Sequence, residues 1–228
     1  MSTIPHSLSG KAVQRLFFLF AVCLFLIPLS ACVRGGAKGG EPPANPNEKK
    51  MAYGLAMTMP PAWAVLNTLS PEAVTKEALD ARRKGGERIV LLEANGAPGP
   101  RNFQPFITAT LVNEEGNFIP REYAEKLSPQ ELDVMAKDMM KRERAQARKN
   151  RTKNNLLEMT FTRETIGGKL ALMQRLTVAG PDGKPIRLLG WDIYLPNGAG
   201  IMIRSGCDLE LPGAAGEVIG IVKTLRVQ

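Results

Sequence analysis

The spacing of hydrophobic positions changes several times along the chain, and each change predicts a different kind of structure. An unbroken apolar run occupies residues 16–27, and residues 33–50 are rich in Gly, Pro, Asn, Lys and Glu without apolar periodicity. Periodic patterns begin at Met51 and continue to Gln228, with no internal repeat and no second linker. Residues 51–228 therefore have the length and the pattern of a single globular domain.

The first half of this domain mixes strand and helix patterns. Alternation of apolar and polar residues predicts strands near residues 55–59, 88–93 and 106–112. Between the first two strands we expect a helix that is capped by Ser70, has Pro71 at its first position, and ends at Gly85 and Gly86.

A second helix is predicted from the capping box of Ser128 and Glu131, which can each satisfy a backbone amide of the first turn. Its first turns carry an apolar stripe at helical spacing, formed by Leu132, Met135, Ala136, Met139 and Met140. A methionine stripe is more often packing than a ligand groove. We therefore expect this part of the helix to lie against the core.

The second half of the domain predicts consecutive strands at residues 157–163, 170–178, 186–195 and 201–208, joined by glycine-containing turns. Alternating side chains expected to meet the core are Leu157, Met159 and Phe161 in one strand, and Leu189, Trp191, Ile193 and Leu195 in another. Asp192 is out of phase with them and is expected to face solvent.

A closing helix carries the stripe Ala215, Val218, Ile219, Val222 and Leu225. The predicted fold class is α+β, an antiparallel sheet packed with helices.

The apolar run near the N-terminus has the layout of an export signal. It follows Lys11 and Arg15, is too short for the roughly 20 residues that span a bilayer, and is interrupted by Pro28. A permanent transmembrane anchor is the alternative that this length disfavours. The run closes in the tetrapeptide Leu29-Ser30-Ala31-Cys32, in which the two small residues leave room for a peptidase groove.

This tetrapeptide resembles the lipobox of bacterial lipoprotein precursors. The resemblance implies a signal peptide at residues 1–31 and cleavage after Ala31. It also implies acylation of Cys32, with membrane lipid as partner. The composition of residues 33–50 predicts a flexible tether, so residues 32–50 are expected to form the acylated cysteine and a linker. Two or more acyl chains give durable anchoring, so we expect a lipid-anchored protein of the cell envelope that faces the periplasm. Val33 is not the aspartate that often retains lipoproteins at the inner membrane, which favours the outer membrane.

Composition then removes several kinds of chemistry from the mature domain. The chain has one histidine, His6, and cleavage removes it, so hydrolase schemes that depend on an imidazole are excluded. With Cys32 acylated and Cys23 discarded, Cys207 is the remaining thiol and has no partner for an internal disulfide. We expect Cys207 to be a small buried group. No cofactor, metal site or catalytic residue is predicted.

The central helix and the meander are flanked by two further segments. These are residues 59–63, with the sequence Met-Pro-Pro-Ala-Trp, and residues 218–226, with the sequence Val-Ile-Gly-Ile-Val-Lys-Thr-Leu-Arg. With this order of elements, the domain resembles the PsbP-like fold, including the DcrB-like lipoproteins of bacterial envelopes. Ala62 stands where these proteins often have glycine. The resemblance implies a non-catalytic accessory or binding module and transfers no catalytic residue to this chain.

The most unusual local feature is a concentration of cations in residues 141–153, where Glu143 is the only acidic residue. The cations are Lys141, Arg142, Arg144, Arg148, Lys149, Arg151 and Lys153. At about 100° per residue these cations cover roughly half of a helix circumference. They leave no core face, so we expect the helix to project beyond the domain or to fray. A solvated helix end is one interpretation, and contact with an anionic envelope surface such as phospholipid headgroups is the other. Nucleic acid is not expected, because an exported domain rarely meets it and no aromatic platform accompanies the cations.

Two functional hypotheses follow from the sequence. The favoured one is a non-enzymatic, lipid-anchored envelope protein that binds or stabilises envelope proteins or a surface. The alternative is an envelope enzyme that uses carboxylates without histidine.

Overall fold

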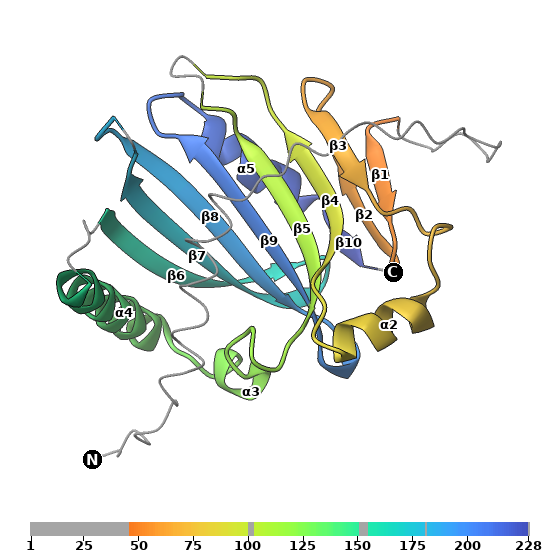
Figure 1. Ribbon diagram of the computed structural model, residues 1–228, viewed down its shortest axis with the longest axis horizontal. Helices are drawn as coiled ribbons and strands as arrows, with labels where there is room; N and C mark the ends of the chain where they lie inside the picture. The colour runs from red at the N-terminus through yellow and green to blue at the C-terminus, as the bar shows by residue number, and fades with distance from the viewer. Residues whose placement is uncertain (1–45, 100–102, 151–154, 181, 228) are drawn as a thin grey trace.

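A seven-stranded antiparallel sheet forms the centre of the computed structural model, which describes residues 46–99, 103–150, 155–180 and 182–227 (Figure 1). Its strands follow the order β3-β4-β5-β9-β8-β7-β6. They are β3 (Ala64–Thr68), β4 (Ile89–Asn95), β5 (Phe106–Asn113), β6 (Leu156–Ile166), β7 (Lys169–Ala179), β8 (Pro185–Tyr194) and β9 (Ala199–Asp208). Each of these strands pairs antiparallel with its neighbours, so the α+β class predicted from the sequence is confirmed.

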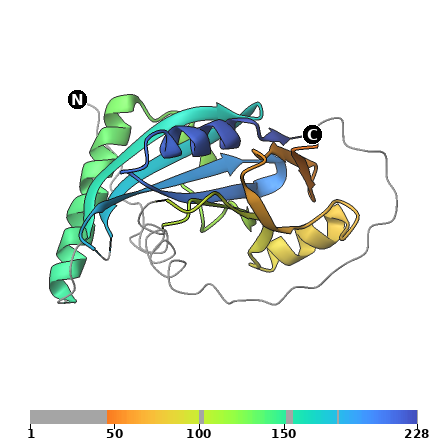
Figure 2. The same ribbon diagram turned by 90° about the horizontal axis from the view of Figure 1, so that it is seen from above.

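A second, three-stranded sheet and four helices complete the described structure. The small sheet has the order β1-β2-β10 and consists of β1 (Glu48–Met51), β2 (Leu55–Thr58) and β10 (Arg226–Val227). The helices are α2 (Lys76–Lys84), α3 (Arg121–Ala124), α4 (Pro129–Lys149) and α5 (Ala214–Lys223). In Figure 2, α5 lies on one face of the large sheet and α4 stands at its β6 end. None of the helices in the described ranges is long and apolar enough to cross a membrane.

Both faces of the large sheet are packed, and each face has its own apolar core. One core joins the sheet to α2, α5 and the small sheet, and it includes Trp191, Ile203 and Val218. The other core joins the sheet to α4, through residues such as Phe161 and Ala136. As a result, β8 buries the side chains of successive residues rather than alternate ones.

This packing on two faces makes the prediction for Asp192 wrong. The side chain of Asp192 is on the face opposite to Trp191, but that face is also covered, and Asp192 is 8% exposed. It is stabilised there by an ion pair with Arg204, with 2.7 Å between Nη2 and Oδ1. Charged groups inside a protein need such partners.

Three local expectations also differ from the structure. The predicted linker extends to residue 50, whereas β1 begins at Glu48 because this segment pairs with β2. Helix α2 begins after Thr75, whose side chain accepts a hydrogen bond from the Ala78 amide, rather than at Ser70. Leu157 is 51% exposed, because a register shift between Leu156 and Glu158 breaks the alternation of β6.

Two other expectations hold. The capping box of α4 is present, with the Ser128 hydroxyl accepting from the Glu131 amide and the Glu131 carboxylate accepting from the Ser128 amide. The stripe of α5 is shifted by one position at its start, so Ala214 is buried in place of Ala215, while Val218 and Val222 pack as expected.

The close packing of β9 generates a prediction about Gly200. A Cβ atom at Gly200 would overlap the ring of Phe118, which is held edge-on against Tyr194 with 5.3 Å between the ring centroids. We expect Gly200→Ala to lower the free energy of unfolding by about 1–3 kcal/mol, because the ring has nowhere to move. Chemical denaturation measures this change.

Gly220→Ala in α5 is the matched control. A Cβ atom there meets nothing within 4 Å, so the same substitution should raise stability by about 0.5–1 kcal/mol through helix propensity. Equal effects of the two variants would contradict the proposed steric cause.

Candidate functional site

The predicted acylation site, Leu29-Ser30-Ala31-Cys32, lies outside the described residues, and so does most of the predicted linker. Its processing and acylation stay predictions. The described chain starts just before β1, which the linker would join to Cys32.

The predicted basic segment forms the last turns of α4. This helix is continuous from Pro129 to Lys149, and its buried residues, Leu132, Ala136 and Met139, all lie in its first half. Its packing within the described structure is mainly against β6. Figure 2 shows that the helix crosses the β6 end of the sheet and continues past it, as expected from the end of the apolar stripe.

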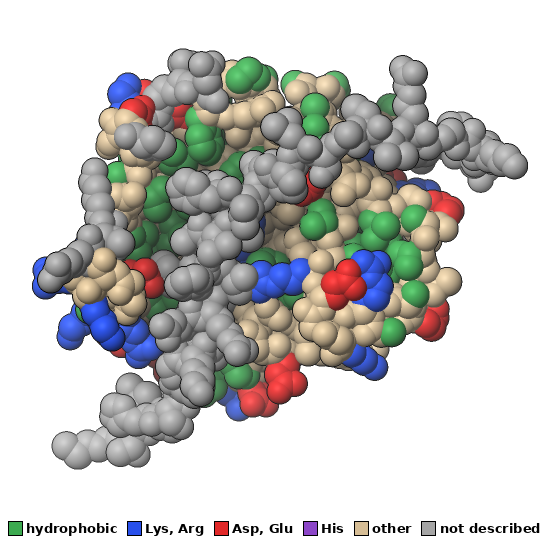
Figure 3. Space-filling model, in the orientation of Figure 1, with side chains coloured by type: hydrophobic (Ala, Val, Ile, Leu, Met, Phe, Trp, Pro, Cys, Tyr) green, Lys and Arg blue, Asp and Glu red, His purple; other side chains and the backbone are tan. Residues whose placement is uncertain are grey.

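Five of the seven predicted cations lie on this projecting part, and we call these residues the basic end of α4: Lys141, Arg142, Arg144, Arg148 and Lys149. All five side chains are exposed, and none is hydrogen-bonded or ion-paired to another residue in the described ranges. Figure 3 shows Lys and Arg side chains gathered where α4 lies. Arg151 and Lys153 are outside the described residues.

The basic end occupies one side of the helix. At about 100° per residue, its five side chains span an arc of about 160°, centred opposite the stripe of Leu132, Ala136 and Met139. Glu143, half-buried, continues the packed side instead. Burial raises the pKa of its carboxyl. The cations therefore point away from the domain.

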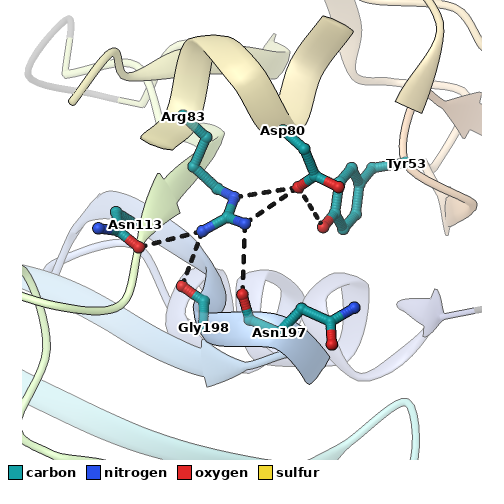
Figure 4. Close-up of polar contacts among 6 residues, drawn as sticks. All are labelled: Tyr53, Asp80, Arg83, Asn113, Asn197 and Gly198. Atoms are coloured by element: carbon teal, nitrogen blue, oxygen red, sulfur yellow. Dashed lines mark hydrogen bonds and ion pairs between the residues drawn. The ribbon is translucent and has the colours of Figure 1, made fainter. Parts of the chain in front are cut away.

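A second polar cluster surrounds Arg83, which comes from α2 and is 1% exposed (Figure 4). Its Nε and Nη2 donate to Asp80 Oδ1 at 3.2 and 3.0 Å. Its Nη1 donates to Asn113 Oδ1 at 3.0 Å and to the Gly198 carbonyl at 2.9 Å, and Nη2 donates to the Asn197 carbonyl at 3.3 Å. All five N–H groups of the guanidinium are thus engaged.

The cluster extends to Tyr53, whose hydroxyl donates to Asp80 Oδ1 at 2.9 Å. Burial, followed by the hydrogen bond to Asp80, raises the pKa of Tyr53 to about 12. Burial opposes ionisation of Asp80, but hydrogen bonds from Tyr53 and Arg83 outweigh it and hold the pKa of Asp80 below its usual range.

The Arg83 cluster holds together segments that are distant in the sequence. It joins α2 to the end of β5, to the turn between β8 and β9, and to the turn between β1 and β2. Tyr53 and Asn197, the two non-glycine residues with positive φ in the described ranges, both belong to it. Because every donor of Arg83 is used within the fold, the cluster is a structural tie and leaves none for a ligand.

The Asp192–Arg204 pair is a third polar feature. The sequence pattern had predicted that Asp192 faces solvent. Besides Asp192, Arg204 donates from Nη1 to the Ile203 carbonyl at 2.9 Å. The guanidinium lies over Gly190, where a Cβ atom would come within 3.1 Å of Nη1. The glycine opposite Arg204 across the strand pair was the available signal, because it makes room for a long side chain lying on the sheet.

An open hollow of about 460 Å³ lies where α3 meets α4 and is lined by Glu122, Tyr123, Lys126, Leu127 and Glu131. Hydrogen bonds from the helix cap hold the pKa of Glu131 below its usual range, so this carboxylate is committed to the cap. No group of three or more His, Cys, Asp or Glu residues suited to a metal ion occurs in the described part of the chain.

Cys207 is buried and free, as predicted. Burial raises the pKa of its thiol to about 11, which disfavours the reactive thiolate.

Two hydrogen bonds join the start of the domain to its closing helix. Trp63 Nε1 donates to Glu217 Oε1 of α5 at 3.0 Å, and the Thr58 amide donates to Thr224 Oγ1 at 2.8 Å. Both contacts stabilise the fold.

Comparison with known proteins gives similarities at the level of structure alone. No family model matches the sequence, and no curated protein matches it. The chain is similar to LpqN of Mycobacterium tuberculosis, a protein involved in cell envelope biogenesis, with 15% identity over 75% of this chain and 82% of LpqN and a TM-score of 0.42.

It is also similar to the cyanobacterial PsbP of Synechocystis, with 12% identity over 88% of this chain and 99% of that protein and a TM-score of 0.42. A third similar structure is the Ran-binding protein Mog1p of Saccharomyces cerevisiae, with 10% identity, coverage of 79% and 95%, and a TM-score of 0.38. At these scores the likeness assigns neither a family nor an activity.

From the contacts of the Arg83 cluster we expect removal of the Asp80 charge to lower the stability of the fold strongly. We expect Asp80→Asn to lower the free energy of unfolding at neutral pH by about 2–4 kcal/mol, because it leaves a buried guanidinium without its counter-charge. Asp80 has a lowered pKa in the folded state, so its stabilisation is present above its ordinary pKa of 3.8 and is lost as the pH falls through the folded value. Denaturant titrations across this pH range measure both effects.

Asp133→Asn on α4 is the control, since Asp133 forms an exposed ion pair with Lys137 at 2.6 Å. It should cost no more than about 0.5 kcal/mol. A loss for Asp80→Asn as small as that of the control would contradict the structural role of the cluster.

The raised pKa of Tyr53 predicts that the stability of the fold changes at alkaline pH. Its folded-state pKa is raised from 10.0 to about 12, so the fold opposes its ionisation and loses stability as the pH rises from 10 towards 12. We expect Tyr53→Phe to be less stable than the wild type at neutral pH, and the difference between the two to shrink above pH 10.

Tyr123→Phe is the control, because the Tyr123 ring is 38% exposed on α3. Its pH dependence should follow that of the wild type. A constant difference between wild type and Tyr53→Phe at all pH values would refute the prediction.

Proposed function

We propose that the chain is the precursor of a lipid-anchored envelope protein whose mature domain binds or supports a partner without catalysing a reaction. The observation that carries this proposal is the order of features before the domain, namely Lys11 and Arg15, the apolar run, and Leu29-Ser30-Ala31-Cys32. Signal peptides with a basic start, an apolar core and small residues before the cleavage site have this order.

Acylated Cys32 would keep the domain close to its membrane. Two or more acyl chains anchor a protein durably, whereas one chain does so only marginally. Residues 33–47 can span no more than about 50 Å even when fully extended, so the domain that starts at β1 would act near the periplasmic surface. The outer membrane is the favoured site, because Val33 follows the acylated cysteine.

The disposition of charged groups supports a binding role over carboxylate catalysis. Two carboxyls with a raised pKa, those of Glu114 and Glu143, lie on different elements, and burial is the main cause in each case. Glu114 is also 3.7 Å from the guanidinium of Arg121. A pair of carboxylates that divides acid and base roles needs convergent side chains, and these two do not supply one.

The proposal predicts that acylation depends on Cys32 and on no other cysteine. When the full chain is produced in bacteria with a clickable palmitate analogue, we expect label in the membrane fraction. The intact mass should equal that of residues 32–228 plus a diacylglyceryl group on the sulfur of Cys32, with or without a further acyl chain on its amine. Cys32→Ser should abolish the label and leave the leader uncleaved.

Cys207→Ser is the matched control and should keep both label and cleavage, because Cys207 is buried within the fold. An unlabelled wild-type chain, or a label that survives Cys32→Ser, would refute the proposal that the chain is a lipoprotein precursor.

A further inference from the structure

We propose that the basic end of α4 docks on the anionic phospholipid headgroups of a bilayer. That the bilayer is the one holding Cys32 rests on the proposed function, whereas the affinity for anionic lipid does not. Five of the cations are exposed, have no ion-pair or hydrogen-bond partner among the described residues, and are directed away from the domain.

Several cations elsewhere on the surface are paired with acids, whereas the five of the basic end gather on one side of a single helix without an ion pair in the described ranges. Ion pairs join Lys137 to Asp133, Lys184 to Glu210, Arg82 to Glu87 and Arg226 to Glu48. The side chains of the basic end have no such partner among the described residues. The nearest acid in sequence, Glu143, lies on the packed side of the helix. The positive potential of this surface is therefore not neutralised by the protein itself.

Stabilisation of the helix does not explain the cations. Positive side chains offset the helix dipole only within the last turn, where Arg148 and Lys149 are found. Lys141, Arg142 and Arg144 precede that turn and gain little from the dipole. Most of the basic end is thus available for an external partner.

The arrangement suits a flat, anionic partner. The cations share an arc of about 160° along about 12 Å of helix axis, and the apolar stripe holds the opposite side against β6. A bilayer can therefore approach all five without disturbing the core. A duplex groove or a protein pocket would need shape as well as charge, and residues 141–149 contain no aromatic side chain on which bases could stack.

The expected gain is large at low salt and small at high salt. Near an anionic membrane each Lys or Arg contributes about a fivefold increase in partitioning, and the attraction decays within a Debye length of about 8 Å at physiological ionic strength. If these contributions add, five cations raise partitioning by somewhat more than about three orders of magnitude when salt is low.

The test uses the mature chain, residues 32–228, carrying Cys32→Ser so that acyl chains contribute nothing. Sedimentation with vesicles of phosphatidylcholine alone, or with about one-third phosphatidylglycerol, is measured at low and high NaCl. One variant changes the basic end to glutamine (K141Q, R142Q, R144Q, R148Q and K149Q). The matched control makes the same change of charge at exposed lysines elsewhere (K50Q, K84Q, K126Q, K137Q and K223Q).

We expect binding to phosphatidylglycerol vesicles at low salt, loss of binding at high salt, and at least a hundredfold loss in the basic-end variant. The control variant should lose less than tenfold, and circular dichroism should show that both variants keep their helices. An equal loss in the two variants, equal binding to neutral vesicles, or tighter binding to duplex DNA than to the anionic vesicles would each overturn the proposal.

Failure here is distinguishable from failure of the proposed function. Acylation of Cys32 is read from intact mass in the full chain, and it is unaffected by the vesicle result. A chain that is acylated but shows no affinity for anionic vesicles would retain the lipoprotein assignment and remove the role of α4.

Discussion

The need to cover both faces of one sheet governs the arrangement of this protein. The central strands bury successive side chains, so β8 places Trp191 in one core and Leu188 in the other. A sheet of this kind cannot leave a face in water, because either face would expose a large apolar area. Helix α5 and the small sheet cover one face, and the first half of α4 packs on the other at β6.

Charged residues inside these layers serve as ties. Arg83 uses all five of its N–H groups on a carboxylate, an amide and two backbone carbonyls, and in doing so fixes two turns with positive φ. Arg204 pairs with Asp192 on the other side of the sheet. A buried charge that is fully satisfied within the protein stabilises one arrangement of the chain and has little left to offer a substrate. The basic end of α4, by contrast, gathers five surface cations that have no ion-pair partner among the described residues.

The sequence predicted the strands of the meander, the capping box and the burial of Cys207, because each depends on local spacing and turn chemistry. Predictions from the sequence were wrong where contacts between distant segments determine the environment of a residue. The solvent position of Asp192 could not be corrected without knowing that the second face is covered and that Arg204 lies across Gly190. Leu157 was misplaced because a bulge moved the alternation by one residue. Ser70 and Pro71 have the composition of a helix start, but Thr75 caps the helix instead. The Arg83 cluster joins residues from four segments that are distant in the sequence, so no local sequence pattern predicts it.

Helix α4 continues well beyond the residues that hold it, which explains how it presents charge. Its capping box and apolar stripe stabilise the first half, and helix formation is cooperative once such a nucleus exists. The second half is rich in Arg, Lys, Ala and Gln, which have high helix propensity, so the helix propagates to Lys149 without a core. Had the same cations followed a flexible segment, each would sample many directions and their ordering on a surface would cost conformational entropy. Fixed on one side of a helix that is anchored at β6, they need no further ordering to face a common partner.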